Sequence, residues 1–229
     1  VQAERVLELD AALRPEGRQG PLVRSLDSYA GYYERWSLAW EAQALLRARP
    51  MAGDDRLGED FISLIDPLRY PEQLAESDVR EIRRIKARVE AERLPRGADP
   101  SRQLKLGRGG LSDVEWLVQL LQLQHAREYP ALRTTATLPA LDALSDAGFL
   151  PEQDTAVLRE SWLLASRIRC ANVIRGGRNP DVLPSSRREL EAVARWCGYA
   201  AGQGAVLEED YLRITRRARG VFERWFYGY

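Results

Sequence analysis

The chain has 229 residues, enough for one large or two small domains, and its 34 Lys and Arg residues balance 34 Asp and Glu residues. The balanced charge argues against bulk binding to nucleic acid, and no apolar run approaches the roughly 18 residues of a membrane span. One histidine, His125, excludes a His-rich zinc site, and two cysteines exclude a disulfide framework and suit a reducing cytosol. The first residues lack a secretory signal, so we expect a cytoplasmic protein with neither nucleic-acid nor membrane partners.

The first predicted element is the only β-prone run in the chain. Val and Leu at residues 6–9 form a short extended pattern that ends at Asp10. Because one strand is not stable alone, we expect its sheet partners to lie outside this sequence, in a larger protein. A Pro- and Gly-rich loop, residues 14–21, follows and carries Arg14 and Arg18.

From residue 26 onward the pattern is helical, with apolar residues at helical spacing and short connections. The predicted helices cover residues 26–49, 57–65, 77–93, 111–124, 137–147, 151–175, 187–198 and 206–227. In the first of these helices the predicted inward stripe consists of Tyr29, Tyr33, Trp36, Trp40 and Ala44. In the last it consists of Tyr211, Ile214, Ala218, Phe222 and Trp225. Such a pattern indicates a helical bundle.

The predicted helix 77–93 is rich in charge. Its inward stripe is Val79, Ile82, Ile85 and Val89, whereas its basic residues alternate with glutamates. These basic residues are Arg80, Arg83, Arg84, Lys86 and Arg88. We interpret them as a solvated face, and a binding patch is the alternative.

Residues 104–124, LKLGRGGLSDVEWLVQLLQLQ, join a basic glycine-rich loop to the most continuous apolar helix of the chain. Leu, Val and Trp point nearly all round the helix axis, which predicts burial between several other helices. One polar line interrupts them, made of Ser112, Glu115, Gln119 and Gln122. It faces either solvent or a polar cleft or neighbouring domain.

Three features could carry chemistry. Asp10 ends the predicted strand, where a carboxylate could help to hold a hard cation such as Mg²⁺. The arginines of the 14–20 loop could grip a phosphate. The loop amides before residue 111, with Lys105 and Arg108 nearby, could favour an anion, although two acidic residues follow directly. We expect His125 to be a packed or surface residue without a catalytic role.

The segment KLGRGGLSDVEWLVQLLQLQHA resembles the GGhxDhEahhQ signature (h apolar, a aromatic) of the glutamine synthetase adenylyltransferase family, which the uridylyltransferase of the PII signal protein shares more loosely. LDAALRPEGRQGPLVRSLDSYAGYYERWSLAWEAQALLRARP resembles the end of that family's nucleotidyltransferase domain. LRTTATLPAL and TRRARGVFERWFYG are similar as well. The DVEW form and the closing FYG resemble the C-terminal half of the enzyme, which attaches AMP.

The resemblance implies a function. Such an enzyme transfers AMP from ATP to a tyrosine of glutamine synthetase with Mg²⁺ held by aspartates. Asp10 matches the family's third metal aspartate, which would make it catalytic and a metal ligand, and Arg14 and Arg18 match the loop that would touch phosphates or lock the strand end. Because the Gly-Ser…Asp-x-Asp motif is absent, we expect this chain alone to be inactive.

The second signature is matched by Gly109, Gly110, Asp113 and Glu115, for which we favour domain packing over catalysis. The implied fold is mainly α, a helical bundle domain at residues 54–229 that follows the last strand and helix of a nucleotidyltransferase (α/β) domain at residues 1–53. The alternative function is a helical interaction module that binds glutamine synthetase or the PII signal protein without chemistry.

Overall fold

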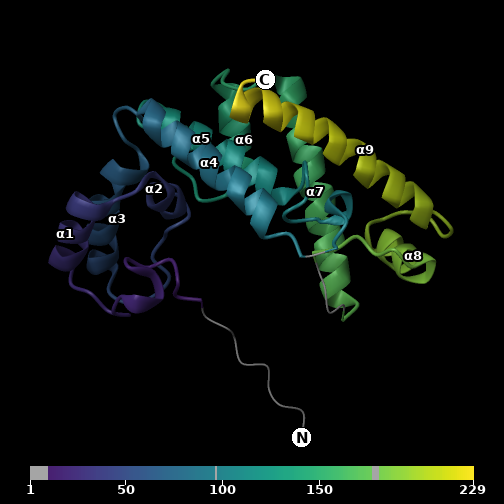
Figure 1. Cartoon of the computed structure of the whole chain (residues 1–229), viewed down its shortest axis with the longest axis horizontal. Helices are drawn as coiled ribbons and strands as arrows, with labels where there is room; N and C mark the ends of the chain where they lie inside the picture. The colour runs from purple at the N-terminus through teal and green to yellow at the C-terminus, as the bar shows by residue number, and fades with distance from the viewer. Residues whose placement is uncertain (1–9, 96, 177–180) are drawn as a thin grey trace, which may run out of the picture.

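The computed structural model describes residues 10–95, 97–176 and 181–229, and this part of the chain is built from helices (Figure 1). The predicted strand at residues 6–9 lies outside the described residues. Within them the one β-type pairing is an isolated bridge between Gln103 and Val182. The mainly helical fold class is therefore confirmed. None of the described helices is both long enough and apolar enough to cross a lipid bilayer.

Three short helices form one end of the molecule (Figure 1). They are α1 (Leu26–Trp36), α2 (Ala39–Leu45) and α3 (Asp55–Arg69). The helix α2 joins this group to the remaining bundle, because its Ala42 and Leu46 belong to the same apolar core as the central helices. The 3₁₀ turns η1 (Gly17–Gln19), η2 (Pro100–Arg102) and η3 (Pro130–Leu132) lie in the connections.

The remaining helices pack around α5 (Leu111–His125). They are α4 (Glu76–Glu92), α6 (Thr137–Asp146), α7 (Glu152–Ile174), α8 (Arg187–Trp196) and α9 (Gly204–Phe222). One core cluster joins α2, α4, α5, α6, α7 and α9, and a second joins the N-terminal half of α9 to α7 and α8. As its all-round apolar pattern predicted, α5 is buried along its length.

The predicted helix 26–49 is wrong as a single element, because the chain breaks between α1 and α2. Leu38 is extended, with φ −114° and ψ 152°, and its N–H donates to the Glu41 carboxylate at 3.1 Å. The Tyr32 hydroxyl donates to the same carboxylate at 2.8 Å. The break turns Trp36 and Trp40 outward, with 67% and 37% of their surfaces exposed, so their predicted inward position is also wrong.

The helix α3 continues past Pro67, although the sequence predicted an end before it. Proline removes one helical hydrogen bond, so the last turn needs other support. Arg69 supplies it, because its buried guanidinium binds Asp66 within the helix and donates to the carbonyls of Leu45 and Ala48. Tertiary contacts therefore override the local proline signal.

Candidate functional site

The glycine-rich loop before α5 is built for close backbone contact with α9. Gly109 has a φ of +71°, and an added Cβ atom would lie 1.8 Å from the carbonyl oxygen of Thr215. At Gly110 the added atom would lie 2.6 Å from the carbonyl oxygen of Leu104. Only glycine fits these positions without displacing backbone. At both positions the backbone of another segment therefore lies close to the glycine.

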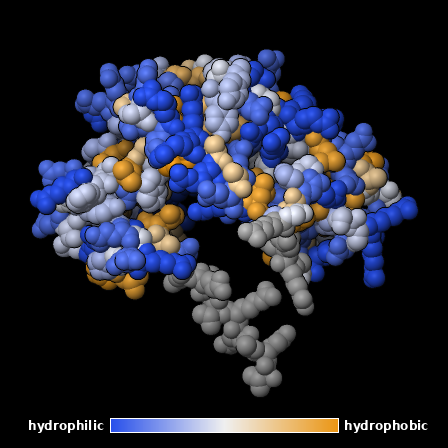
Figure 2. All heavy atoms as spheres, viewed as in Figure 1, coloured by the Kyte–Doolittle hydropathy of each residue, from blue (hydrophilic) through white to orange (hydrophobic). Residues whose placement is uncertain are grey.

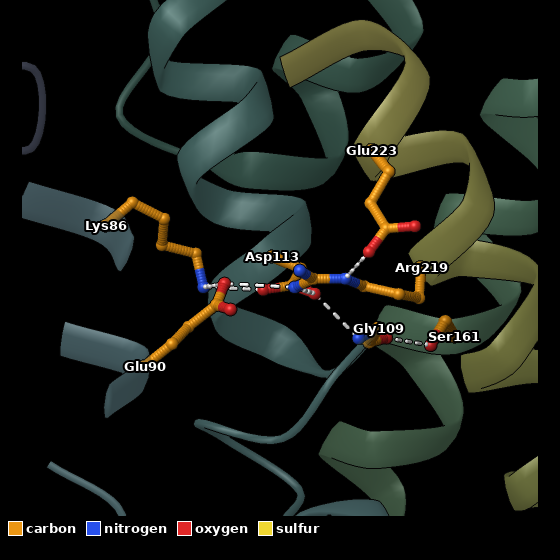
Figure 3. Close-up of polar contacts among 7 residues, drawn as sticks. All are labelled: Lys86, Glu90, Gly109, Asp113, Ser161, Arg219 and Glu223. Atoms are coloured by element: carbon orange, nitrogen blue, oxygen red, sulfur yellow. Dashed lines mark hydrogen bonds and ion pairs between the residues drawn. The ribbon is translucent and has the colours of Figure 1, made fainter. Parts of the chain in front are cut away.

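Asp113 turns back from the first turn of α5 into this loop (Figure 3). Its Oδ2 accepts hydrogen bonds from the Gly109 N–H at 2.7 Å and from Arg219 Nη1 at 3.1 Å. Its Oδ1 accepts from Lys86 Nζ at 2.5 Å, and both side chains of this pair are 1% exposed. Asp113 therefore connects the loop to α4 and α9.

Two more carboxylates complete a buried cluster that we call the ion cluster: Lys86, Glu90, Asp113, Arg219 and Glu223. Glu90 accepts from Lys86 at 2.9 Å and from Arg219 at 3.0 Å, and Glu223 accepts from Arg219 Nε at 2.7 Å. The ring of Phe222 lies 5.3 Å from Lys86 Nζ and 5.1 Å from the Arg219 guanidinium carbon, which adds cation–π contacts.

The contacts in the cluster favour the charged forms of Glu90 and Arg219. Burial alone would raise the pKa of Glu90, but hydrogen bonds from Arg219 and Lys86 outweigh it and lower the pKa. Burial acts to lower the pKa of Arg219, and its bonds to Glu90 and Glu223, together with the charge of Asp113, raise it overall. Each charged group thus has its partner inside the protein. The arrangement joins α4, α5 and α9.

The interpretation of the basic residues of α4 as a solvated face is wrong for Lys86. It is one of only two lysines in the chain and lies four residues after the buried Ile82, on the inward side of the helix. Together with Glu90, Arg219 and Glu223 it was missed by sequence reasoning. The sequence did contain one signal for its burial: Lys86 lies at helical spacing from the apolar residues Val79 and Ile82.

The possible anion site at the start of α5 is already filled by the chain itself. The N–H groups of Gly110, Leu111 and Ser112 donate to the carbonyls of Gly107, Leu104 and Lys105, while Gly109 donates to Asp113. These are the amides that a phosphate would have needed. Gly110 stands at the cap position of α5, without a side-chain cap.

The polar line of α5 faces other segments of the protein instead of open solvent. Ser112 and Gln122 are buried, while Glu115 and Gln119 are half-buried. Gln119 accepts a hydrogen bond from Gln43 of α2 at 2.8 Å, and Gln122 donates to the carbonyls of Leu132 and Thr134. The line therefore contacts α2 and the η3 connection, with no hydrogen bond to Asp10.

Asp10 and its loop lie at the start of the described chain. The exposed Asp10 accepts the Ala12 N–H on Oδ1 at 2.9 Å, which leaves Oδ2 open. Arg14 donates from all three guanidinium nitrogens to the carbonyls of Ala11, Arg18 and Gly20. These contacts hold together the loop that follows Asp10. The Arg18 side chain is exposed.

A magnesium site needs several oxygen ligands. Within the described residues no group of three or more His, Cys, Asp or Glu side chains could hold a metal ion. Asp10 fits one ligand position, because it is exposed and its Oδ2 has no hydrogen-bond partner among the described residues. A set of three such ligands would need at least one residue from outside the described part of the chain.

His125 packs at the end of α5. Its ring stacks on Phe149 at a centroid distance of 3.8 Å, and burial lowers its pKa. This matches the expected packed role. The two cysteines, Cys170 and Cys197, are both free thiols.

Together the described residues form a helical fold in which Gly109 and Asp113 connect the loop before α5 to α4 and α9. A family model described as GlnD PII-uridylyltransferase matches residues 82–226, well over half of the chain, and one described as glutamate-ammonia ligase adenylyltransferase matches residues 2–63. The chain belongs to the GlnD PII-uridylyltransferase family in this helical part.

Curated relatives named bifunctional glutamine synthetase adenylyltransferase/adenylyl-removing enzyme are similar along nearly the whole chain. The Streptomyces avermitilis protein is 60% identical over 227 residues, which cover 99% of this chain and 23% of the relative. The Leifsonia xyli protein is 60% identical over 97% of this chain, and the Mycobacterium avium protein is 55% identical over 96%; each is covered to 22%. The resemblance inferred from motifs is confirmed, and the chain spans less than a quarter of these relatives.

Proposed function

We propose that the chain forms part of an enzyme that transfers AMP from ATP to a tyrosine of glutamine synthetase, in the half that attaches AMP. The observation that carries this proposal is the 60% identity over 227 residues to a protein named for this activity. The signature glycines and Asp113 would serve the enzyme by fixing the helical domain. The protein would work in the cytoplasm with glutamine synthetase as its partner.

In this proposal Asp10 is one of the carboxylates that hold Mg²⁺, and the metal supplies charge neutralisation at the phosphates. Arg14 keeps the Asp10 loop in place through its three carbonyl contacts. Arg18 is exposed and could bind an ATP phosphate. Residues 1–53 would end the nucleotidyltransferase domain and residues 54–229 would form the helical domain.

A second candidate is a helical interaction module that binds glutamine synthetase or the PII signal protein without chemistry. The apolar surface near α1 and α2 supports it, because Trp36, Leu38 and Met51 are 67%, 56% and 74% exposed. Exposed apolar groups of this size are typical of contact surfaces.

We expect the isolated 229-residue chain to transfer no AMP to glutamine synthetase in the presence of ATP and Mg²⁺. The physical reason is that Asp10 offers only one of the carboxylates that a phosphoryl-transfer metal site requires. Incorporation of radiolabelled AMP into glutamine synthetase measures this directly. Incorporation of AMP that depends on the added chain would contradict the proposal that Asp10 supplies only one of the required carboxylates.

A further inference from the structure

A cleft of about 670 Å³ opens where α6 turns into α7. The end of α6, the start of α7 and Trp225 line it. It lies apart from the ion cluster and from the Asp10 loop, since none of their residues line it. The face of the molecule in Figure 2 is mostly hydrophilic, with scattered apolar residues.

Trp225 is held at the cleft by a local change of helix geometry. The chain after α9 forms a π-helical turn, η4 (Glu223–Tyr227), in which the Gly228 N–H reaches the Glu223 carbonyl at 3.2 Å. This turn places Phe226 in the core and leaves Trp225 37% exposed, so the predicted burial of Trp225 is wrong. Such turns often occur at functional sites.

A fixed contact orients the indole. The Trp225 Nε1–H donates to Asp154 Oδ2 at 2.8 Å, and Arg224 binds the other carboxylate oxygen at 2.9 Å. Asp154 is itself 7% exposed. The aromatic wall of the cleft is therefore anchored to α7 instead of being a loose surface side chain.

The charge around this wall is negative. Asp142 and Arg159 both line the cleft, and they form an ion pair with each other. Asp146 and Glu152 are exposed, line the cleft and have no hydrogen bond or ion pair with any described residue. Two free carboxylates beside an indole ring form the environment that attracts an organic cation.

Thr155 adds an unpaired polar group to the lining. The residue is 6% exposed, and its Oγ1 has no hydrogen-bond partner among the described residues. A buried hydroxyl without a partner is unfavourable, and rotation about χ1 toward the cleft breaks no existing bond. A donor group of a ligand would satisfy it.

We propose that this cleft binds the guanidinium group of an arginine side chain from a protein partner. The planar cation would stack on Trp225, pair with Asp146 and Glu152, and donate to Thr155 Oγ1. Arginine fits better than lysine, because its flat group both stacks on an aromatic ring and bonds carboxylates in parallel pairs.

The test uses the ¹⁵N-labelled 229-residue chain and follows the indole N–H resonance of Trp225, assigned with Trp225→Phe. The probe is Nα-acetyl-arginine methylamide, and the neutral citrulline analogue is its matched control. We expect a saturable shift with a dissociation constant on the order of millimolar, because one cation–π contact and exposed ion pairs are individually weak. The lysine analogue should bind about threefold or more weakly.

The double variant Asp146→Asn/Glu152→Gln should weaken binding about tenfold, and Thr155→Val about threefold. Asp27→Asn/Glu59→Gln removes the same charge from exposed positions on α1 and α3 and should leave binding unchanged. Equal shifts with the arginine and citrulline analogues, or equal weakening by both double variants, would overturn the proposal.

Discussion

Replacing Asp113 by alanine is expected to lower the free energy of unfolding by about 3–5 kcal/mol. The change leaves Lys86, with 1% of its side chain exposed, and Arg219 without one of their carboxylate partners. It also removes the acceptor of the Gly109 N–H, which holds the loop before α5. Lys86 then keeps only Glu90, which it shares with Arg219, so buried donor groups lose an acceptor that solvent cannot replace. Urea unfolding of the 229-residue chain, followed by far-UV circular dichroism, measures the effect.

The matched control for this change is Glu76→Ala. Glu76 pairs with Arg80 at 3.3 Å on the open face of α4, and both side chains are largely exposed. Loss of such a pair changes stability by less than about 0.5 kcal/mol. If Asp113→Ala fell within that range as well, the ion cluster would not hold the three helices together.

Replacing Gly109 by alanine is expected to destabilise the protein by about 3 kcal/mol or more. Two effects add: a left-handed backbone costs a residue with a side chain about 1–2 kcal/mol, and the new methyl group must displace the backbone of α9. The added Cβ would lie 1.8 Å from the Thr215 carbonyl oxygen and 3.0 Å from the Arg219 nitrogen. Neither backbone atom can move without shifting α9. The same unfolding measurement applies.

Gly148→Ala separates these two effects. Gly148 has a nearly equal φ of +76°, yet nothing lies within 4 Å of an added Cβ atom. It should therefore show only the backbone contribution of about 1–2 kcal/mol. Equal losses at Gly109 and Gly148 would mean that the close approach to α9 contributes nothing.

Much of the fold could be predicted from the sequence because it depends on local pattern. Apolar residues on all sides of the helix at 111–124 predicted a buried central helix, and α5 lies buried among the other helices. At the start of α8 the Ser186 hydroxyl accepts the Glu189 N–H, a contact between near neighbours in the chain. Helical period and capping are properties of neighbouring residues, so a sequence carries them directly.

The errors arose where distant residues decide the outcome. Lys86 is buried because Asp113, 27 residues away, and Glu90 accept its hydrogen bonds. Trp225 is turned outward because Asp154, 71 residues away, binds its indole N–H. No periodicity within one helix contains such partners.

The candidate site could be predicted only in part. Gly109 and Asp113 were assigned to packing, and the structure gives the contacts that perform it. Glu115 matches the signature, yet no described residue forms a hydrogen bond or ion pair with its half-buried side chain, so its role stays open to experiment. For Asp10 the strand that would position it lies outside the described residues, and its metal role remains a proposal.

The central claim is that Asp10 carries chemistry, whereas the glycine-rich signature carries packing. Its most direct test is Asp10→Ala in an adenylyltransferase that has the length of the curated relatives and contains this segment. We predict that the rate of AMP transfer to glutamine synthetase falls by about 100-fold or more, as expected when a charge-stabilising group is removed from a transfer site. Binding of glutamine synthetase and the melting temperature should stay unchanged, because Asp10 is exposed and its one hydrogen bond is local. Unchanged AMP transfer by this variant would contradict the claim and leave the chain as an interaction module.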